Sequence, residues 1–143
     1  MKLKKQTGFA AVELVIGIPV LMMLLVGVME VARIFIEMNT LNKAVRVGAR
    51  YATTQSGASG CNPIIAESGN IKDLVVYGDL SAGGSALLTD WETSDITVSC
   101  EDNLFVTVSG EYTFQPKFMS KIPGTEFSLE VPMSASTVMR IVQ

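Results

Sequence analysis

Histidine is absent from this sequence, and cysteine and charged residues are scarce. Its 143 residues include two cysteines, and 17% are charged. Without histidine there are no histidine general bases, no histidine-activated nucleophiles and no histidine-ligated metals, and two cysteines cannot supply a four-ligand zinc site. We therefore expect no metal and no cofactor. The net charge of −3 also argues against nucleic-acid binding, which requires a clustered basic face.

Apolar residues, in contrast, are in excess. They make up 48% of the chain, and the mean hydropathy of +0.38 is high for a soluble domain. Much of this excess lies in residues 9–29, where Glu13 is the only charge. As a helix this run spans about 30 Å, the thickness of the hydrocarbon core of a bilayer. It predicts a transmembrane helix. The alternative is a buried helix of a soluble domain, which the remaining chain has little mass to cover.

A short basic leader, residues 1–8, precedes the apolar run. In an ordinary secretory signal the apolar core is shorter, and a small-residue cleavage site follows it. Here the run is too long, and residues 30–33 do not resemble such a site. If the leader is removed, Gly8 is the cleavage position that the sequence offers. The helix would then be retained in the mature protein.

The cysteines indicate the orientation of the helix better than the flanking charges do. Three lysines lie among residues 1–5 and four basic residues lie between positions 33 and 50, so the two flanks nearly balance. Cys61 and Cys100 form a lone pair without metal partners, which favours a disulfide and an oxidising compartment. The alternative is two unpaired buried thiols. We therefore expect a cytoplasmic N-terminus and a periplasmic or external chain from residue 30 onward.

Residues 30–56 predict an amphipathic continuation of the same helix. Apolar residues recur every three or four positions, at Val31, Ile34, Phe35, Met38, Leu41, Val45, Gly48, Ala49 and Ala52. The face opposite this stripe is expected to carry Arg33, Glu37, Lys43, Arg46 and Arg50. A helix from Phe9 to Thr54 would be about 70 Å long. The glycine-containing segment at residues 56–60 is expected to end it.

Residues 57–143 predict a small β-rich head. From position 51 onward the chain has eleven acidic and four basic residues, a charge of −7, whereas residues 1–50 carry +4. Alternating patterns predict strands at residues 96–100, 104–109, 112–114, 127–131 and 133–141, with a hairpin link at Asp102-Asn103. Residues 71–77 fit either a strand or a short helix. The predicted fold class is α+β, a long N-terminal helix packed by a small antiparallel β-sheet.

Glu13 is the residue that suggests a function. A carboxylate near the start of an apolar helix is costly in lipid and is a functional-site hypothesis by default. One interpretation is a side chain that reaches back to the membrane surface. In the other, cleavage after Gly8 makes Phe9 a new N-terminus whose amine pairs with Glu13 on a neighbouring copy of the helix.

Three stretches of this sequence resemble a known family. They are residues 8–14 (Gly-Phe-Ala-Ala-Val-Glu-Leu), the later Pro19, Gly27 and Glu30, and residues 44–52 (Ala-Val-Arg-Val-Gly-Ala-Arg-Tyr-Ala). Together they resemble the N-terminal module of TadE-like proteins, which are minor pilins or pseudopilins of the bacterial tight-adherence (Tad/Flp) type IV pilus. The resemblance covers residues 8–52, and the looser tail fits through its two cysteines and final strand.

The resemblance implies a pilin-like fold and a sequence of events. A prepilin peptidase would cut after Gly8, and the retained helix would hold the subunit in the bacterial inner membrane. An inner-membrane assembly platform with its ATPase would then extract it, and Glu13 would neutralise the Phe9 amine of an adjacent subunit. The implied partners are this peptidase and platform, membrane lipid, other minor pilins and the major pilin. The implied role is surface adherence, with incorporation in the extracellular pilus as one outcome.

Two departures qualify the resemblance. Leu14 stands where the small major pilins of these systems usually have tyrosine, and those subunits are much shorter, which favours a minor pilin. Gly17 and Pro19 could kink the helix for filament packing, or the proline is tolerated in lipid without that role.

Two other classes of function stay open. In a bitopic binding or adhesion module, the helix would be only an anchor for the acidic head. A membrane-tethered enzyme would need acid pairs such as Asp90/Glu92 or Glu101/Asp102, which are more often a solvated face. Aromatic residues of the head could form its core or an exposed binding surface; these are Trp91, Tyr112 and Phe114.

Overall fold

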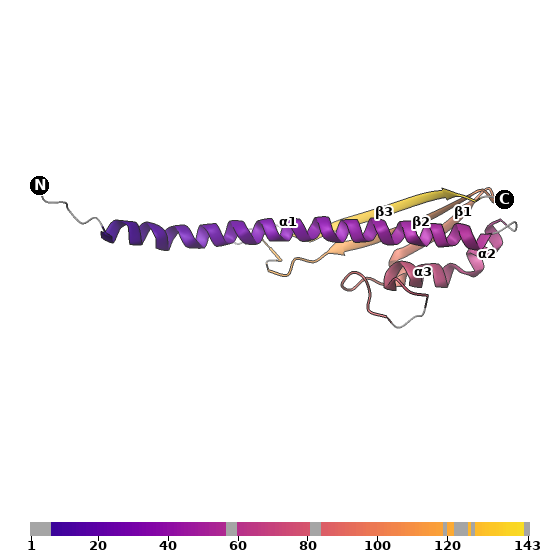
Figure 1. Ribbon diagram of the computed structural model, residues 1–143, viewed down its shortest axis with the longest axis horizontal. Helices are drawn as coiled ribbons and strands as arrows, with labels where there is room; N and C mark the ends of the chain where they lie inside the picture. Colours follow the sequence, from indigo (N-terminus) through magenta and orange to yellow (C-terminus); the bar gives the residue numbers. More distant parts are fainter. Residues whose placement is uncertain are drawn as a thin grey trace, which may run out of the picture.

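In the computed structural model, one long helix, α1 (Thr7–Ser56), carries the rest of the chain on its C-terminal half (Figure 1). The structure describes residues 7–56, 60–80, 84–118, 120–121, 126 and 128–141, and for residues 7–10 and 56 it describes the backbone only. Residues 1–6 of the predicted leader lie outside the described residues. The predicted α+β fold class is confirmed.

The head contains an antiparallel sheet of three strands. They are β1 (Ile96–Glu101), β2 (Phe105–Phe114) and β3 (Val131–Arg140), in the order β1-β2-β3. Asp102 and Asn103 connect β1 to β2 and have φ angles of 53° and 55°. Such left-handed conformations are more accessible to Asp and Asn than to most residues, which is why this dipeptide forms the predicted hairpin link.

The segment between α1 and the sheet is helical. It forms α2 (Cys61–Ala66), α3 (Ser68–Tyr77) and a short 3-10 helix, η2 (Thr93–Asp95). Residues 71–77 are therefore helix rather than strand, because Ile71, Val75 and Val76 lie on one buried face of α3. The β-rich head predicted for residues 57–143 thus contains two α-helices beside its sheet.

The predicted strand at residues 127–131 is largely wrong. Ser128 forms only an isolated bridge with Lys121, and Val131 already begins β3. Phe127 lies outside the described residues. The chain between β2 and β3 instead reaches along α1 toward its N-terminal half, and in Figure 1 it is the part of the head that lies furthest in that direction.

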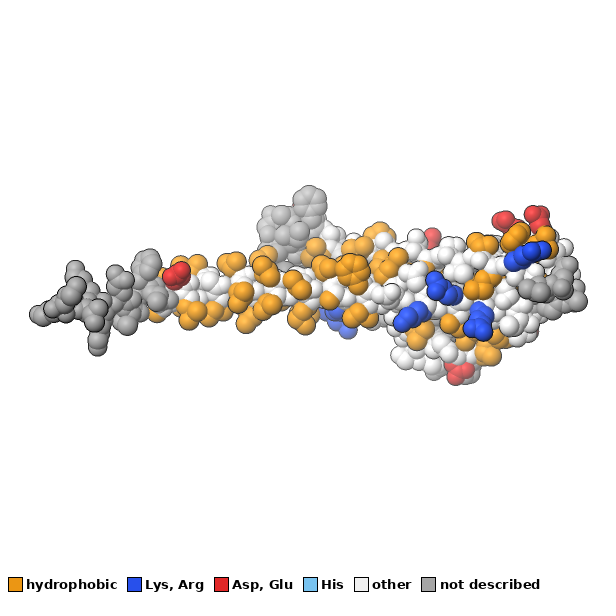
Figure 2. Space-filling model, turned by 45° about the horizontal axis from the view of Figure 1, so that its top comes forward, with side chains coloured by type: hydrophobic (Ala, Val, Ile, Leu, Met, Phe, Trp, Pro, Cys, Tyr) orange, Lys and Arg blue, Asp and Glu red, His pale blue; other side chains and the backbone are white. Residues whose placement is uncertain are grey.

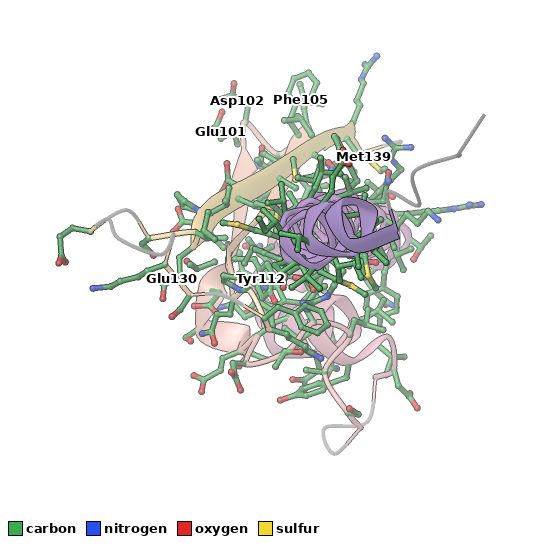
Figure 3. The ribbon with its side chains drawn as sticks, turned by 90° about the vertical axis from the view of Figure 1, so that its left-hand side faces the viewer. Glu101, Asp102, Phe105, Tyr112, Glu130 and Met139 are labelled. Carbon is green, nitrogen blue, oxygen red and sulfur yellow. A yellow bond between two sulfur atoms is a disulfide. The ribbon has the colours of Figure 1, made fainter. Side chains whose placement is uncertain are left out.

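The core lies between α1, α3 and the sheet. Figure 3, viewed along α1, shows the sheet on one side of the helix and α3 on an adjoining side. The core includes Leu41, Val45, Ala49 and Ala52 of α1, Ile71 and Val75 of α3, and Val106 and Val108 of β2. Trp91, Tyr112 and Phe114 are buried in this core, so they are not an exposed binding surface. Trp91 also donates a hydrogen bond from Nε1 to the carbonyl of Glu111 at 2.9 Å.

Gly48 allows the close approach of α1 and α3. A Cβ atom built on Gly48 would lie 2.3 Å from Cγ2 of Val75. No side chain fits there without displacing Val75, which is itself fully buried. The small residues of α1 at positions 44, 48, 49 and 52 therefore set how closely the helix lies against the head.

Candidate functional site

The N-terminal half of α1 has no protein cover. No residue between 11 and 29 is buried, and the apolar side chains project around the helix (Figure 2). Among the described residues, α1 is the one helix long and apolar enough to cross a membrane. A continuous apolar surface of this length is not stable in water, so it must be covered by lipid or by other apolar helices.

The predicted processing and assembly residues lie at the start of this bare segment. Gly8 and Phe9 are in the first turn of α1, and the Phe9 side chain lies outside the described residues. Glu13 is exposed, one turn further along. Within residues 11–55, whose side chains are described, Glu13 makes no ion pair. Its carboxylate is therefore available to a group outside these residues.

Gly17 and Pro19 lie one turn and one and a half turns beyond Glu13. A Cβ atom on Gly17 would meet nothing within 4 Å, so the helix has a notch on its exposed surface there. The helix is continuous through both residues, and the kink suggested for them remains a prediction.

Where α1 reaches the head, Glu30 connects the helix to the β2–β3 segment. Its side-chain Oε1 accepts hydrogen bonds from the backbone N–H groups of Lys117 and Phe118, at 3.1 and 3.0 Å. Its Oε2 lies 3.2 Å from Nη1 of Arg33. Glu30 is only 8% exposed, and these three donors compensate the cost of burying its charge.

Arg33 extends this network toward the sheet. Its Nη2 pairs with Oε1 of Glu37 at 3.2 Å, and its guanidinium lies 5.4 Å from the ring centre of Phe114. Oε2 of Glu37 is buried without a hydrogen-bond partner among the described residues. Burial and, after it, the negative charge of Glu37 together raise the pKa of Tyr112 to about 12.

The amphipathic stripe predicted for residues 30–56 is correct from Met38 onward, but between residues 31 and 37 only Ile34 packs against the head as predicted. Arg33 and Glu37 face the head instead of solvent, while Val31 and Phe35 are exposed. The reason is the partners available: the head supplies backbone donors and an aromatic ring that periodicity alone does not reveal. The spacing of four residues between Arg33 and Glu37 is a sequence signal for the ion pair that they form. No local pattern predicts the hydrogen bonds of Glu30 with residues 117 and 118.

Cys61 and Cys100 form the predicted disulfide, with their Cα atoms 5.7 Å apart. The bond joins α2 to β1 and closes a separation of 39 residues. The N–H of Cys61 also donates to Oδ1 of Asn103 in the hairpin link, at 3.2 Å. These contacts fasten the end of the head that lies farthest from the bare half of α1 (Figure 1).

The geometry defines a class of protein: a disulfide-bonded α+β head carried on a single helix that is long and apolar enough to anchor it in a membrane. Residues 8–50 match the family model described as TadE-like protein. The resemblance to TadE-like proteins is thereby confirmed for α1, from its first turn to well inside the packed half. Comparisons with curated proteins and with solved structures found no match. Among the described residues, no group of acidic or cysteine side chains could hold a metal ion.

Proposed function

We propose that this protein is a minor pilin or pseudopilin that takes part in assembling a Tad/Flp-type pilus for surface adherence. The observation that carries the proposal is the TadE-like match over residues 8–50, because it falls on a helix whose first half lacks protein cover. A helix of this kind can lie in a membrane before assembly and among other helices afterward. The protein acts as a structural subunit and not as an enzyme.

A prepilin peptidase removes the leader after Gly8 in this proposal, and the helix from Phe9 onward is retained. The test is mass spectrometry of the intact protein extracted from membranes of a strain with the peptidase and of one without it. A mature chain that begins at Phe9 only in the first strain is expected. A chain that begins elsewhere in both strains would refute the processing step.

Glu13 then neutralises the amine of Phe9 on an adjacent subunit. Its exposure on an otherwise apolar helix surface supports this role, since a carboxylate in apolar surroundings gains most from a buried cation. We expect Glu13→Gln to impair piliation and leave membrane insertion unchanged. Glu130→Gln, which neutralises an exposed carboxylate of the head, is the matched control. Normal piliation with Glu13→Gln would favour a side chain that only reaches the membrane surface.

The proposed orientation has the N-terminus in the cytoplasm and the head in the periplasm. The Cys61–Cys100 disulfide supports it, since such bonds persist in oxidising compartments. Labelling of thiols in intact cells and in lysates tests it: protection of both cysteines until reduction is expected. Assembly partners are the inner-membrane platform with its ATPase, other minor pilins and the major pilin. A pulldown with the head domain as bait, attached to its own helix, tests these contacts.

A second candidate is a bitopic binding or adhesion module. The charge of −7 from residue 51 onward favours it, because such a head suits a basic target. Replacing residues 9–29 by an unrelated membrane span distinguishes the two. The module would keep its function, whereas the pilin would lose assembly.

A further inference from the structure

The base of the head overlaps the segment of α1 that is long enough to cross the membrane. A groove of about 310 Å³ lies between α1 and the head. On the helix side it begins at Val26 and Gly27, inside the apolar run of residues 9–29, and on the head side it includes Phe114, Pro116 and Leu129. If residues 9–29 fill the hydrocarbon core, the head cannot stand clear of the membrane.

Glu30 fixes the position of this base along the axis of α1. By binding the N–H groups of Lys117 and Phe118, it holds the start of the β2–β3 segment beside α1. The side chain of Phe118 is nevertheless 59% exposed. The Phe118 side chain is therefore exposed, although its backbone N–H is hydrogen-bonded to the buried carboxylate of Glu30.

The exposed surface of α1 stays apolar beyond this level. Val31, Phe35 and Ile36 are all exposed, whereas the charged residues Glu30, Arg33 and Glu37 face the head. From Phe9 to Met29 the helix rises by about 30 Å, the thickness of the hydrocarbon core, and each headgroup zone adds about 5 to 8 Å. Val31 therefore lies within one headgroup zone, and Phe35 and Ile36 lie at its outer edge.

We infer that the base of the head is seated in the outer headgroup zone of the membrane, with Phe118 and Phe35 as aromatic anchors and Lys117 next to the lipid phosphates. The inference rests on the proposed membrane insertion of residues 9–29. Phenylalanine has no polar group, but its ring is buried at the boundary of headgroups and acyl chains when it lies on the apolar face of an interfacial element. Glu30 is buried, and Arg33 and Glu37 are paired and partly buried against the head, which reduces the cost of bringing these three charges close to lipid.

Charge complementarity favours a phospholipid surface as the occupant. The chain from residue 51 onward has four basic residues, and two of them, Lys117 and Lys121, lie in the β2–β3 segment at the base. Lys121 pairs with the exposed Glu126 at 3.4 Å, which leaves the exposed Lys117 as the cation best placed for a phosphate. The segment also carries Glu126 and Glu130, so its net charge is zero, whereas the rest of the chain from residue 51 onward carries −7. The base is therefore the part of the head that an anionic lipid surface repels least, and Lys117 is its free cation among the described residues.

Tryptophan fluorescence in vesicles tests the seating. The full chain is reconstituted in vesicles of phosphatidylethanolamine and phosphatidylglycerol whose acyl chains are brominated near the headgroup, with the buried Trp91 as a constant background. Phe118→Trp and Phe35→Trp report on the base, and Leu25→Trp reports on the span. Val138→Trp is the matched control, because Val138 is 60% exposed but lies at the other end of β3.

The inference predicts that bromine quenches the added fluorescence at positions 118, 35 and 25 and leaves that at position 138 unchanged. Quenching at position 25 without quenching at position 118 would overturn the seating and leave membrane insertion intact; the apolar base would then be a surface for another helix. Loss of quenching at position 25 as well would overturn both the insertion and the seating.

The role of Lys117 is tested separately with the Phe118→Trp chain. Quenching at position 118 should decrease when phosphatidylcholine replaces phosphatidylglycerol, and Lys117→Gln should remove this dependence on anionic lipid. Lys43→Gln is the control, since Lys43 is an exposed cation of α1 that lies well beyond the headgroup zone. Equal lipid dependence in both variants would refute the phosphate contact.

Discussion

The two halves of α1 differ in what covers them. From residue 11 to 29 the helix is apolar apart from Glu13 and none of its residues is buried, whereas from residue 38 onward one side packs against α3 and the sheet. The first half depends on a partner outside this chain, and the second depends on the head. The boundary between them is marked by the buried Glu30 and the partly buried Arg33 and Glu37.

Because of this difference, substitutions in the two halves should affect different measured properties. Changes in the packed half should alter the free energy of unfolding of the head, while changes in the bare half should alter membrane insertion or assembly. Unfolding of the head in detergent can be followed by the fluorescence of Trp91, which is 2% exposed. Each variant below therefore tests the boundary between the halves.

The largest effect is expected from loss of the disulfide. Replacing both cysteines in C61A/C100A should lower the free energy of unfolding of the head by about 4 kcal/mol, because the unfolded chain is no longer closed into a loop. Urea unfolding of the variant and the parent measures the difference. Membrane extraction of the two proteins should be identical, and a variant that no longer inserts would show that the halves are not independent.

The next effect is expected at the boundary. Glu30→Ala removes the acceptor of the Lys117 and Phe118 N–H groups and leaves Arg33 with one partner, so the head should lose about 2 to 3 kcal/mol. Urea unfolding measures this loss. Glu126→Ala removes the exposed pair with Lys121 and should change stability by less than about 1 kcal/mol. Equal losses would mean that Glu30 acts only as a surface charge.

A smaller effect distinguishes glycines in the two halves. Gly48→Ala places a methyl group against Val75 and should cost about 1 to 2 kcal/mol after the gain in helix propensity is subtracted. Gly17→Ala meets no atom within 4 Å and should leave the head unchanged. Thermal unfolding of both variants in the same detergent measures the contrast. A stabilised Gly48→Ala protein would show that α1 and α3 separate easily.

The smallest effect appears only at high pH. The pKa of Tyr112 is raised to about 12 in the folded protein, from 10.0. Above pH 10 the unfolded chain releases this proton while the folded state keeps it, so the unfolded state binds fewer protons and stability falls as pH rises toward 12. Below pH 10 the contribution is fully present. Urea unfolding at increasing pH should show a shallower fall for Tyr112→Phe than for the parent.

Much of this molecule could be predicted from local patterns. The apolar run, the helix beyond it, the hairpin at Asp102-Asn103 and the disulfide follow from periodicity, turn chemistry and cysteine count. The direction in which Arg33 and Glu37 point could not be predicted in this way. Arg33 lies over the ring of Phe114 in β2, and the neighbouring Glu30 accepts hydrogen bonds from residues 117 and 118. These contacts join residues more than seventy positions apart in sequence, and no local pattern encodes them.

The sequence by itself determined that α1 is long, that its first half is apolar on every side and that Glu13 is its only charge there, because hydropathy and period are properties of neighbouring residues. Only the tertiary structure decided where the bare half ends. Residues 30–37 carry three charges that the sequence alone would assign to water. The head instead buries Glu30 and partly buries Arg33 and Glu37, while Val31, Phe35 and Ile36 stay exposed. A buried charge is stable only when its donors are in place, and the fold supplies them.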